Sequence, residues 1–324
     1  MDPHLLRTFV AVVEHRSFSA AAQDLGYTQS AVSQHIAALE ADLGTRLVGR
    51  RPVAATEAGR RLLEHARPLL LRLDAARADL ARLRDVRPAR LAVVCGPAAL
   101  TPAWAGALAR VRQALPGLAV TVRVRGREAV LRAVLTGDAD LALVDGVTAP
   151  SDPLPLPDTG TLTTLAVGEQ PLVILLPSGH PLAGRRGLRL ADLADAHWLD
   201  APDAAVPLGR LRAAAHTDGF RAHATYEGTD LRALGTLVAG GNGLAALPST
   251  AADGLPGTVA VPVSAPRLVH RTEALHPKAP AKAVEKLLAE PGLVRGAMAG
   301  PAASGAALHR PMPGAPARGV AETA

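Results

Sequence analysis

The stretch SFSAAAQDLGYTQSAVSQHIAALEADLG, residues 17–44, predicts two short helices joined by a turn. Ser19 is placed to cap the first helix, and Gly26 is placed to end it. Thr28 is placed to cap the second helix, which should extend to about residue 43. Two helices and a tight turn of this size are the core of a helix-turn-helix.

The second of these helices has one apolar side and one polar side. Apolar residues at every third or fourth position predict a buried stripe: Val32, Ile36, Leu39 and Leu43. Short or flexible side chains form the other stripe: Gln29, Ser30, Ser33, Gln34 and Ala37. A helix in the major groove needs both donors and acceptors to read base edges. An ordinary solvated face more often carries Glu and Lys pairs, and from this helix alone both interpretations stay open.

Residues 45–55, TRLVGRRPVAA, predict a strand, a turn and a second strand directly after this helix. Three arginines lie near the turn: Arg46, Arg50 and Arg51. Guanidinium groups suit phosphate oxygens, so the hairpin is interpreted as a wing that contacts a nucleic-acid backbone. The charge is local, because residues 45–61 hold five arginines and one glutamate while residues 1–60 are neutral overall. The alternative is a hairpin whose arginines are only solvated.

Residues 57–87 predict one long helix with an apolar seam. The seam residues are spaced alternately by four and three positions: Leu62, Ala66, Leu69, Leu73, Ala76, Leu80 and Leu83. A heptad spacing predicts pairing with a helix of a second subunit, which would present two recognition helices to two half-sites. Pro68 is expected to kink this helix or to remove a hydrogen bond. The alternative is a helix that packs along its own domain.

From residue 91 the chain alternates between strand and helix patterns. Strands at 91–95, 119–125 and 141–144, with helices at 100–114 and 128–135, predict a parallel sheet covered by helices. Beyond the proline-rich residues 149–160, strands are expected at 172–176, 197–199, 222–226, 244–247 and 269–275, and helices at 190–194, 208–217, 231–239 and 281–289. The fold class expected for the whole chain is α+β and α/β.

Composition narrows the class of protein. The chain has 324 residues, of which 48% are hydrophobic, and a formal net charge of +6. No apolar run approaches the length of a membrane span or of a secretory signal, so we expect a cytoplasmic protein without a membrane partner. One cysteine, Cys95, excludes an intramolecular disulfide, and its place at the end of a buried strand favours an inert core thiol over a redox sensor. The histidine spacings suit no metal, so no metal and no cofactor are expected.

Several motifs together resemble the LysR-type transcriptional regulators. The N-terminal matches are LLRTF (5–9), SFSAAA (17–22), LGYTQSAVSQHI (25–36) and TEAG (56–59). Looser matches are GDADLA (137–142), PSGHPLA (177–183) and VAGGNGLAALP (238–248). The resemblance covers roughly residues 3–288. Val48 departs from it where an aromatic residue is common, and Gln34 replaces a frequent arginine, which should weaken guanine readout.

The resemblance implies three functional parts. These are a winged helix-turn-helix over residues 1–58, a linker and dimerisation helix over 59–87, and a two-lobed effector-binding domain similar to periplasmic binding proteins over 88–288. Lobe 1 would comprise about 88–148 and 264–288, and lobe 2 about 161–263. Residues 289–324, rich in Gly, Pro and Ala, are expected to form a disordered tail.

Such regulators bind double-stranded DNA as homodimers or homotetramers, and a small-molecule effector alters their DNA contacts. The residues implied to contact DNA are Thr28, Gln29, Ser30, Ser33, Gln34, Arg46, Arg50 and Arg51.

An effector in this architecture is expected in the crevice between the lobes, at the carboxyl ends of the strands. The loops that should meet there contain Pro97, Ala98, Ala99, Thr101, Gly126, Arg127, Asp145, Asp203 and Thr229. Arg127 is suited to an anionic effector such as a carboxylate, and the amides of Ala98 and Ala99 to holding one at a helix N-terminus. For each of these residues the alternative is an ordinary loop residue.

The competing function is an enzyme built on the α/β portion, with the N-terminal helices as an accessory. The sequence contains no GxSxG, no dinucleotide fingerprint and no nucleophile and base at a known spacing, so no catalytic residue is expected. The sequence therefore favours a DNA-binding transcription regulator whose promoter contacts respond to a small molecule.

Overall fold

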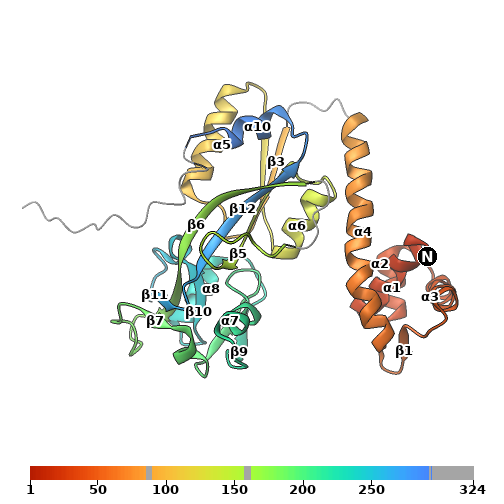
Figure 1. Ribbon diagram of the computed structural model, residues 1–324, viewed down its shortest axis with the longest axis horizontal. Coiled ribbons are helices and arrows are strands. Elements are labelled where there is room, and N and C mark those ends of the chain that lie inside the picture. The colour runs from red at the N-terminus through yellow and green to blue at the C-terminus, as the bar shows by residue number, and fades with distance from the viewer. Residues whose placement is uncertain (85–89, 157–161, 292, 294–324) are drawn as a thin grey trace, which may run out of the picture.

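The computed structural model describes residues 1–84, 90–156, 162–291 and 293, and Figure 1 shows their arrangement. A small helical domain lies along one end of a long helix, and a larger α/β part follows. Most of the tail expected over 289–324 lies outside the described residues, as do the side chains of Arg50 and Leu83.

The helical domain contains three short helices and a hairpin. They are α1 (Pro3–His15), α2 (Phe18–Leu25), α3 (Gln29–Leu43), β1 (Val48–Arg50) and β2 (Val53–Ala55), and β1 pairs with β2 in antiparallel register. Phe9, Val12 and Leu39 are fully buried in its core. The predicted helix-turn-helix and hairpin are therefore confirmed.

Two details of the helical domain differ from the sequence prediction. Ser17, not Ser19, caps α2, because Ser17 has an extended backbone and its side chain accepts a hydrogen bond from the Ala20 amide. Leu43 was expected in the buried stripe, but its side chain is 39% exposed. All residues from 41 to 46 are exposed, so the last turn of α3 extends past the core.

The long helix α4 (Glu57–Arg84) runs through Pro68 without interruption. Its seam divides into two parts. Ala66 is fully buried in the core of the helical domain, and Leu62 packs against the same core. In contrast, Leu69 is 49% exposed and Leu80 is 62% exposed. The first part of the seam thus packs on its own domain, and the later part leaves apolar surface uncovered.

The α/β part is built around one large sheet. Its strands are β3 (Arg90–Cys95), β4 (Ala119–Val124), β5 (Leu141–Thr148), β6 (Leu162–Pro177), β7 (Leu188–Arg189), β10 (Ala245–Pro248), β11 (Thr258–Ala265) and β12 (Val269–Pro277). The order is β4-β3-β5-β12-β6-β11-β7, and β10 pairs with β6. A separate two-stranded sheet joins β8 (Trp198–Asp200) to β9 (Ala222–Thr225). The helices are α5 (Pro102–Ala114), α6 (Arg127–Leu135), α7 (Leu208–Ala215), α8 (Leu231–Ala239), α9 (Ser249–Ala252) and α10 (Lys282–Leu288), with a 3₁₀ turn at Leu190–Leu193.

Two long strands join the two lobes of this part. The first half of β6 pairs with β12, and its second half pairs with β10 and β11. Figure 1 shows β6 and β12 running from one lobe to the other. Only residues 172–176 of β6 were predicted, because the polar residues around Glu169 interrupt the apolar run. The strand β11 was not predicted. Across the residues placed in the structure, no helix is long and apolar enough to cross a membrane.

Candidate nucleic-acid interface and interlobe site

The outer side of α3 is polar and exposed, as the spacing predicts. All five of its predicted contact residues are exposed: Thr28, Gln29, Ser30, Ser33 and Gln34. On the inner side Val32 and Leu39 are fully buried. Thr28 caps the helix by accepting a hydrogen bond from the Ala31 amide at 3.2 Å. The helix is therefore anchored by one face while the glutamine and serine side chains face outward.

The hairpin is fixed to α3 and α4 by residues that sequence reasoning did not assign to the site. The Glu40 carboxylate accepts hydrogen bonds from the Leu47 amide at 2.8 Å and the Val48 amide at 3.1 Å. The Thr56 hydroxyl donates to the Arg46 carbonyl at 2.7 Å. Glu40 therefore holds the start of the hairpin on the recognition-like helix, and the sequence carried no signal for this long-range contact.

Gly59 allows the hairpin to approach α4 closely. A Cβ atom at this position would lie 2.2 Å from the Leu47 carbonyl oxygen, which is far inside contact distance. Glycine is therefore needed for close backbone approach and not for an unusual φ angle.

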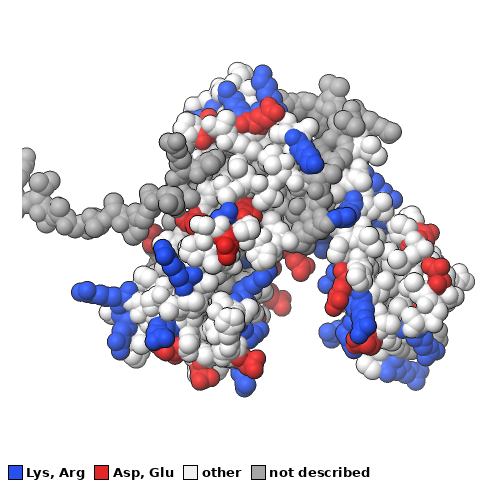
Figure 2. All heavy atoms as spheres, viewed as in Figure 1, with Lys and Arg blue, Asp and Glu red and all other residues white. Residues whose placement is uncertain are grey.

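Arginines gather near the hairpin. Arg46 and Arg51 are exposed, and neither side chain has an ion pair or hydrogen bond within the part of the chain that the structure describes. The nearby acid Glu57 pairs instead with Arg60 and Arg61. Figure 2 shows positive side chains at the end of the helical domain where β1 lies. Two cationic groups are thus available to an anionic partner beside the exposed side of α3.

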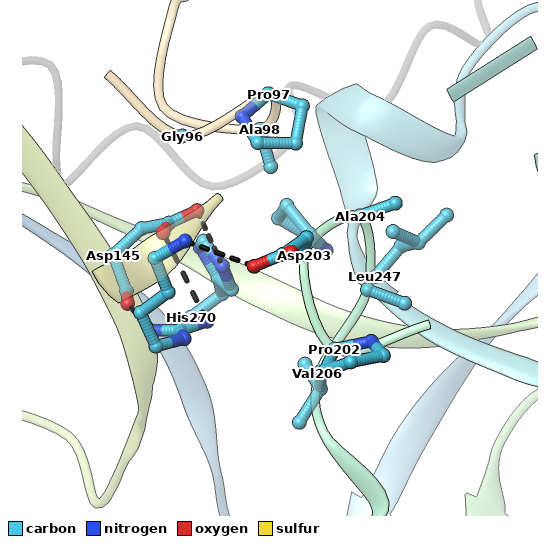
Figure 3. A pocket seen from close by; sticks show the side chains of 13 residues that line it. Gly96, Pro97, Ala98, Asp145, Pro202, Asp203, Ala204, Val206, Leu247 and His270 are labelled. Carbon is cyan, nitrogen blue, oxygen red and sulfur yellow. Dashed lines mark hydrogen bonds and ion pairs between the residues drawn. The ribbon is translucent and has the colours of Figure 1, made fainter. Parts of the chain in front are cut away.

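The structure brings five of the predicted effector residues to one crevice between the lobes: Pro97, Ala98, Arg127, Asp145 and Asp203. Its volume is only about 10 Å³, roughly the space of one water molecule. Figure 3 shows Asp203 pointing across it toward Asp145 and His270. The Arg127 amide donates to the Asp203 carboxylate at 3.1 Å. The predicted Gly126 lies beside this contact, and a Cβ there would be 2.3 Å from the Asp203 carboxylate.

A buried charge cluster forms one wall of the crevice. His270 Nε2 lies 3.3 Å from Asp145 Oδ2, and Arg127 donates to the Asp145 carbonyl. Burial alone would raise the pKa of the Asp145 carboxyl, but the hydrogen bond and charge of His270 and the charge of Arg127 outweigh it, so the pKa is lowered. Sequence reasoning missed His270, which reaches the site only because β12 pairs with β5.

Besides Gly126, three predicted effector residues do not line this crevice. The Ala99 amide donates to the Gly96 carbonyl at 3.2 Å, so it is not free for a ligand, and the Ala99 side chain lies in the core. The helix begins at Pro102, so Ala98 and Ala99 do not form its N-terminus. Thr101 precedes that helix without a side-chain cap bond, and Thr229 lies outside the lining.

Cys95 lies in the same core at the end of β3. It is fully buried, and burial, with the nearby Asp145 charge, raises the pKa of its thiol to about 11. A thiol of this kind stays protonated and poorly nucleophilic at neutral pH.

Two family models match nearly the whole described chain. Residues 3–60 match the bacterial regulatory helix-turn-helix of the lysR family, and residues 84–290 match the LysR substrate binding domain. The chain belongs to the LysR family. It is therefore a DNA-binding transcription regulator that carries an effector-binding domain.

Individual relatives of this LysR-family chain are moderately similar. The probable hydrogen peroxide-inducible genes activator of Mycobacterium avium is 34% identical over 249 residues, covering 76% of this chain and 77% of that protein. The regulator BudR of Raoultella terrigena is 34% identical over 200 residues, covering 60% of this chain and 66% of that protein. Among solved structures, full-length BenM is 25% identical, with a TM-score of 0.49 and coverage of 89% and 94% of the two chains.

Proposed function

We propose that this LysR-family chain recognises a specific DNA sequence through the exposed side of α3. Gln29, Ser33 and Gln34 read base edges, while Ser30 and the hairpin arginines Arg46, Arg50 and Arg51 contact phosphates. Thr28, the N-cap of α3, lies at the end of the helix that faces the phosphates. The observation that carries this proposal is the exposed stripe of glutamine and serine beside two exposed arginines, Arg46 and Arg51.

The proposed division of labour follows the three parts of the chain. Residues 1–58 bind DNA, residues 59–87 link and dimerise, and residues 88–288 sense the effector. The exposed leucines at 69 and 80 support assembly through α4, because a second copy of the seam would cover them. The active form is a homodimer or homotetramer, and it acts in the cytoplasm, where its DNA partner lies.

The effector response is proposed to arise from movement of the two lobes about β6 and β12. In this structure the lobes meet directly, since the Arg127 amide binds Asp203 across the crevice. An anionic effector that bound the Arg127 amide in place of the Asp203 carboxylate would break this contact and separate the lobes. Binding would therefore increase the population of the conformation with separated lobes. The α/β part is proposed to act as a sensor and not as an enzyme.

The test is a gel shift with DNA that flanks the gene of this protein. We expect retention at nanomolar protein that weakens steeply as salt increases, because arginine–phosphate contacts release counterions. Retention no stronger than that of unrelated DNA at every salt concentration would contradict the proposal.

A further inference from the structure

A second cavity, much larger than the closed crevice, lies beside it. Its volume is about 300 Å³, compared with about 10 Å³ for the crevice. Lobe 1 contributes α6 and the end of β5, lobe 2 contributes the start of α7, and residues 154–156 come from the segment that connects the lobes. We call this space the α6–α7 cavity. Arg127 and Asp145 line both spaces.

Most of the wall of the α6–α7 cavity is apolar. The apolar side chains are Leu131, Val144, Val147, Leu154, Pro155, Leu156 and Pro207. The volume is at the lower end of the range for small-molecule pockets. An apolar body of one or two rings fits such a space, and its transfer from water is favourable.

The wall formed by residues 151–156 is held in place by two carboxylates, of which Glu273 is buried and Glu169 is partly exposed. The Leu154 amide donates to Glu273 at 3.1 Å, and the Ser151 amide donates to Glu169 at 3.0 Å. Arg271 binds both carboxylates, at 2.7 Å and 2.6 Å respectively. This segment is therefore an ordered wall, and the cavity is formed before any ligand enters.

The charges around the cavity favour an anionic group at the α7 end. Arg210 is exposed there, and its side chain has no ion pair or hydrogen bond among the residues that the structure places. The carboxylate of Asp145 is already paired with His270 and Arg127. Glu128, on α6 across the cavity, adds an exposed carboxylate that would repel an anion from that end. A carboxylate bound at Arg210 would gain a charge-assisted pair of hydrogen bonds.

We infer that the α6–α7 cavity binds a compact apolar monocarboxylate of one or two rings, with its carboxylate at Arg210 and its body against Leu131 and Leu154. The cavity adjoins the interlobe crevice and shares Arg127 and Asp145 with it. The helix α6 also contacts the linker helix α4. A ligand bound against α6 therefore contacts a helix that packs directly on the linker. The inference rests on the proposed sensor function and names the chemical class of its ligand, and binding at this cavity does not require DNA.

The test is calorimetric titration of the full chain with 1-naphthoate and with its neutral analogue 1-naphthamide. We expect saturable binding of 1-naphthoate and weaker binding of the amide. Arg210→Ala should raise the dissociation constant for 1-naphthoate about tenfold, the equivalent of one charge-assisted hydrogen bond, and leave the amide unchanged. Leu131→Trp should fill the cavity and abolish binding of both compounds.

Glu128→Gln is the matched control, because it removes a negative charge at the same cavity, whereas Arg210→Ala removes a positive one. It should not weaken 1-naphthoate binding. Melting curves check the fold of Leu131→Trp, and if that variant is unfolded the exposed Arg210→Ala decides the question. No saturable binding by the wild type, or an unchanged dissociation constant in Arg210→Ala, overturns the inference. Loss of DNA retention by the unliganded wild type would overturn the proposed function alone.

Discussion

His270 and Asp145 form a buried ion pair, with Nε2 and Oδ2 3.3 Å apart and His270 only 3% exposed. The pair joins β12 to β5 at the wall of the interlobe crevice. We expect Asp145→Asn to lower the free energy of unfolding by about 3 kcal/mol, because it leaves Arg127 and His270 without their carboxylate. Urea denaturation followed by tryptophan fluorescence measures this loss, since Trp104 and Trp198 are buried in the α/β part.

The same pair predicts a pH dependence of stability. The pKa of Asp145 is lowered in the folded protein, so its contribution is complete above the unfolded carboxyl pKa of about 4 and is lost as the pH falls through the lower folded value. The stability difference between wild type and Asp145→Asn should therefore shrink as the pH falls below about 4. A difference that grows as the pH falls below about 4 would contradict this assignment.

Glu40 is expected to determine the position of the hairpin. Glu40→Ala leaves the Leu47 and Val48 amides without their acceptor, which should cost about 1–3 kcal/mol in stability and weaken DNA retention. Glu40→Gln keeps an acceptor oxygen of the same reach and is the matched control. If the alanine variant binds DNA as tightly as the glutamine variant, Glu40 does not position the wing.

Leu80 tests the role of α4 in assembly. It is 62% exposed, so Leu80→Lys should leave the fold of one chain intact while placing a charge in the seam. Sedimentation should then show a smaller oligomer than the wild type. Glu64→Lys introduces the same side chain at an exposed position outside the seam, and it should not change the sedimentation coefficient. Equal sedimentation of all three proteins would count against the seam.

Cys95 should be inert in the folded protein. A fully buried thiol with a pKa of about 11 should react with a thiol reagent at pH 8 only slowly, and rapidly once urea unfolds the chain. Wild type and Cys95→Ser should bind DNA equally well before and after peroxide treatment, although one relative is named a probable hydrogen peroxide-inducible genes activator. Rapid labelling of the native protein would contradict the buried position.

The sequence was most informative where the deciding interactions are local. The buried and exposed sides of α3 follow from spacing within one helix, and Thr28 caps it through an amide three residues away. Family motifs further indicated the two-lobed sensor. The sequence does not distinguish Ser17 from Ser19 as the cap of α2, because both side chains have the same chemistry and only backbone geometry separates them.

Contacts between distant residues could not be predicted in this way. His270 meets Asp145, and Glu40 meets Leu47, only after strands pair and the hairpin folds back on α3. The first half of β6 is a strand because β12 lies beside it, although its own residues lack a clear apolar alternation. The volume of the crevice depends on how the lobes meet, and no sequence pattern indicates that it is closed.

The most direct test of this account measures discrimination between operator DNA and a scrambled sequence. Ser33→Ala combined with Gln34→Ala should retain the oligomer and the salt-sensitive binding but lose most of the preference for the operator, because two of the three base-reading side chains are gone and the arginines remain. Arg51→Ala is the comparison and should weaken binding to both DNAs alike. A double variant that still prefers the operator as strongly as the wild type would show that α3 does not read the bases.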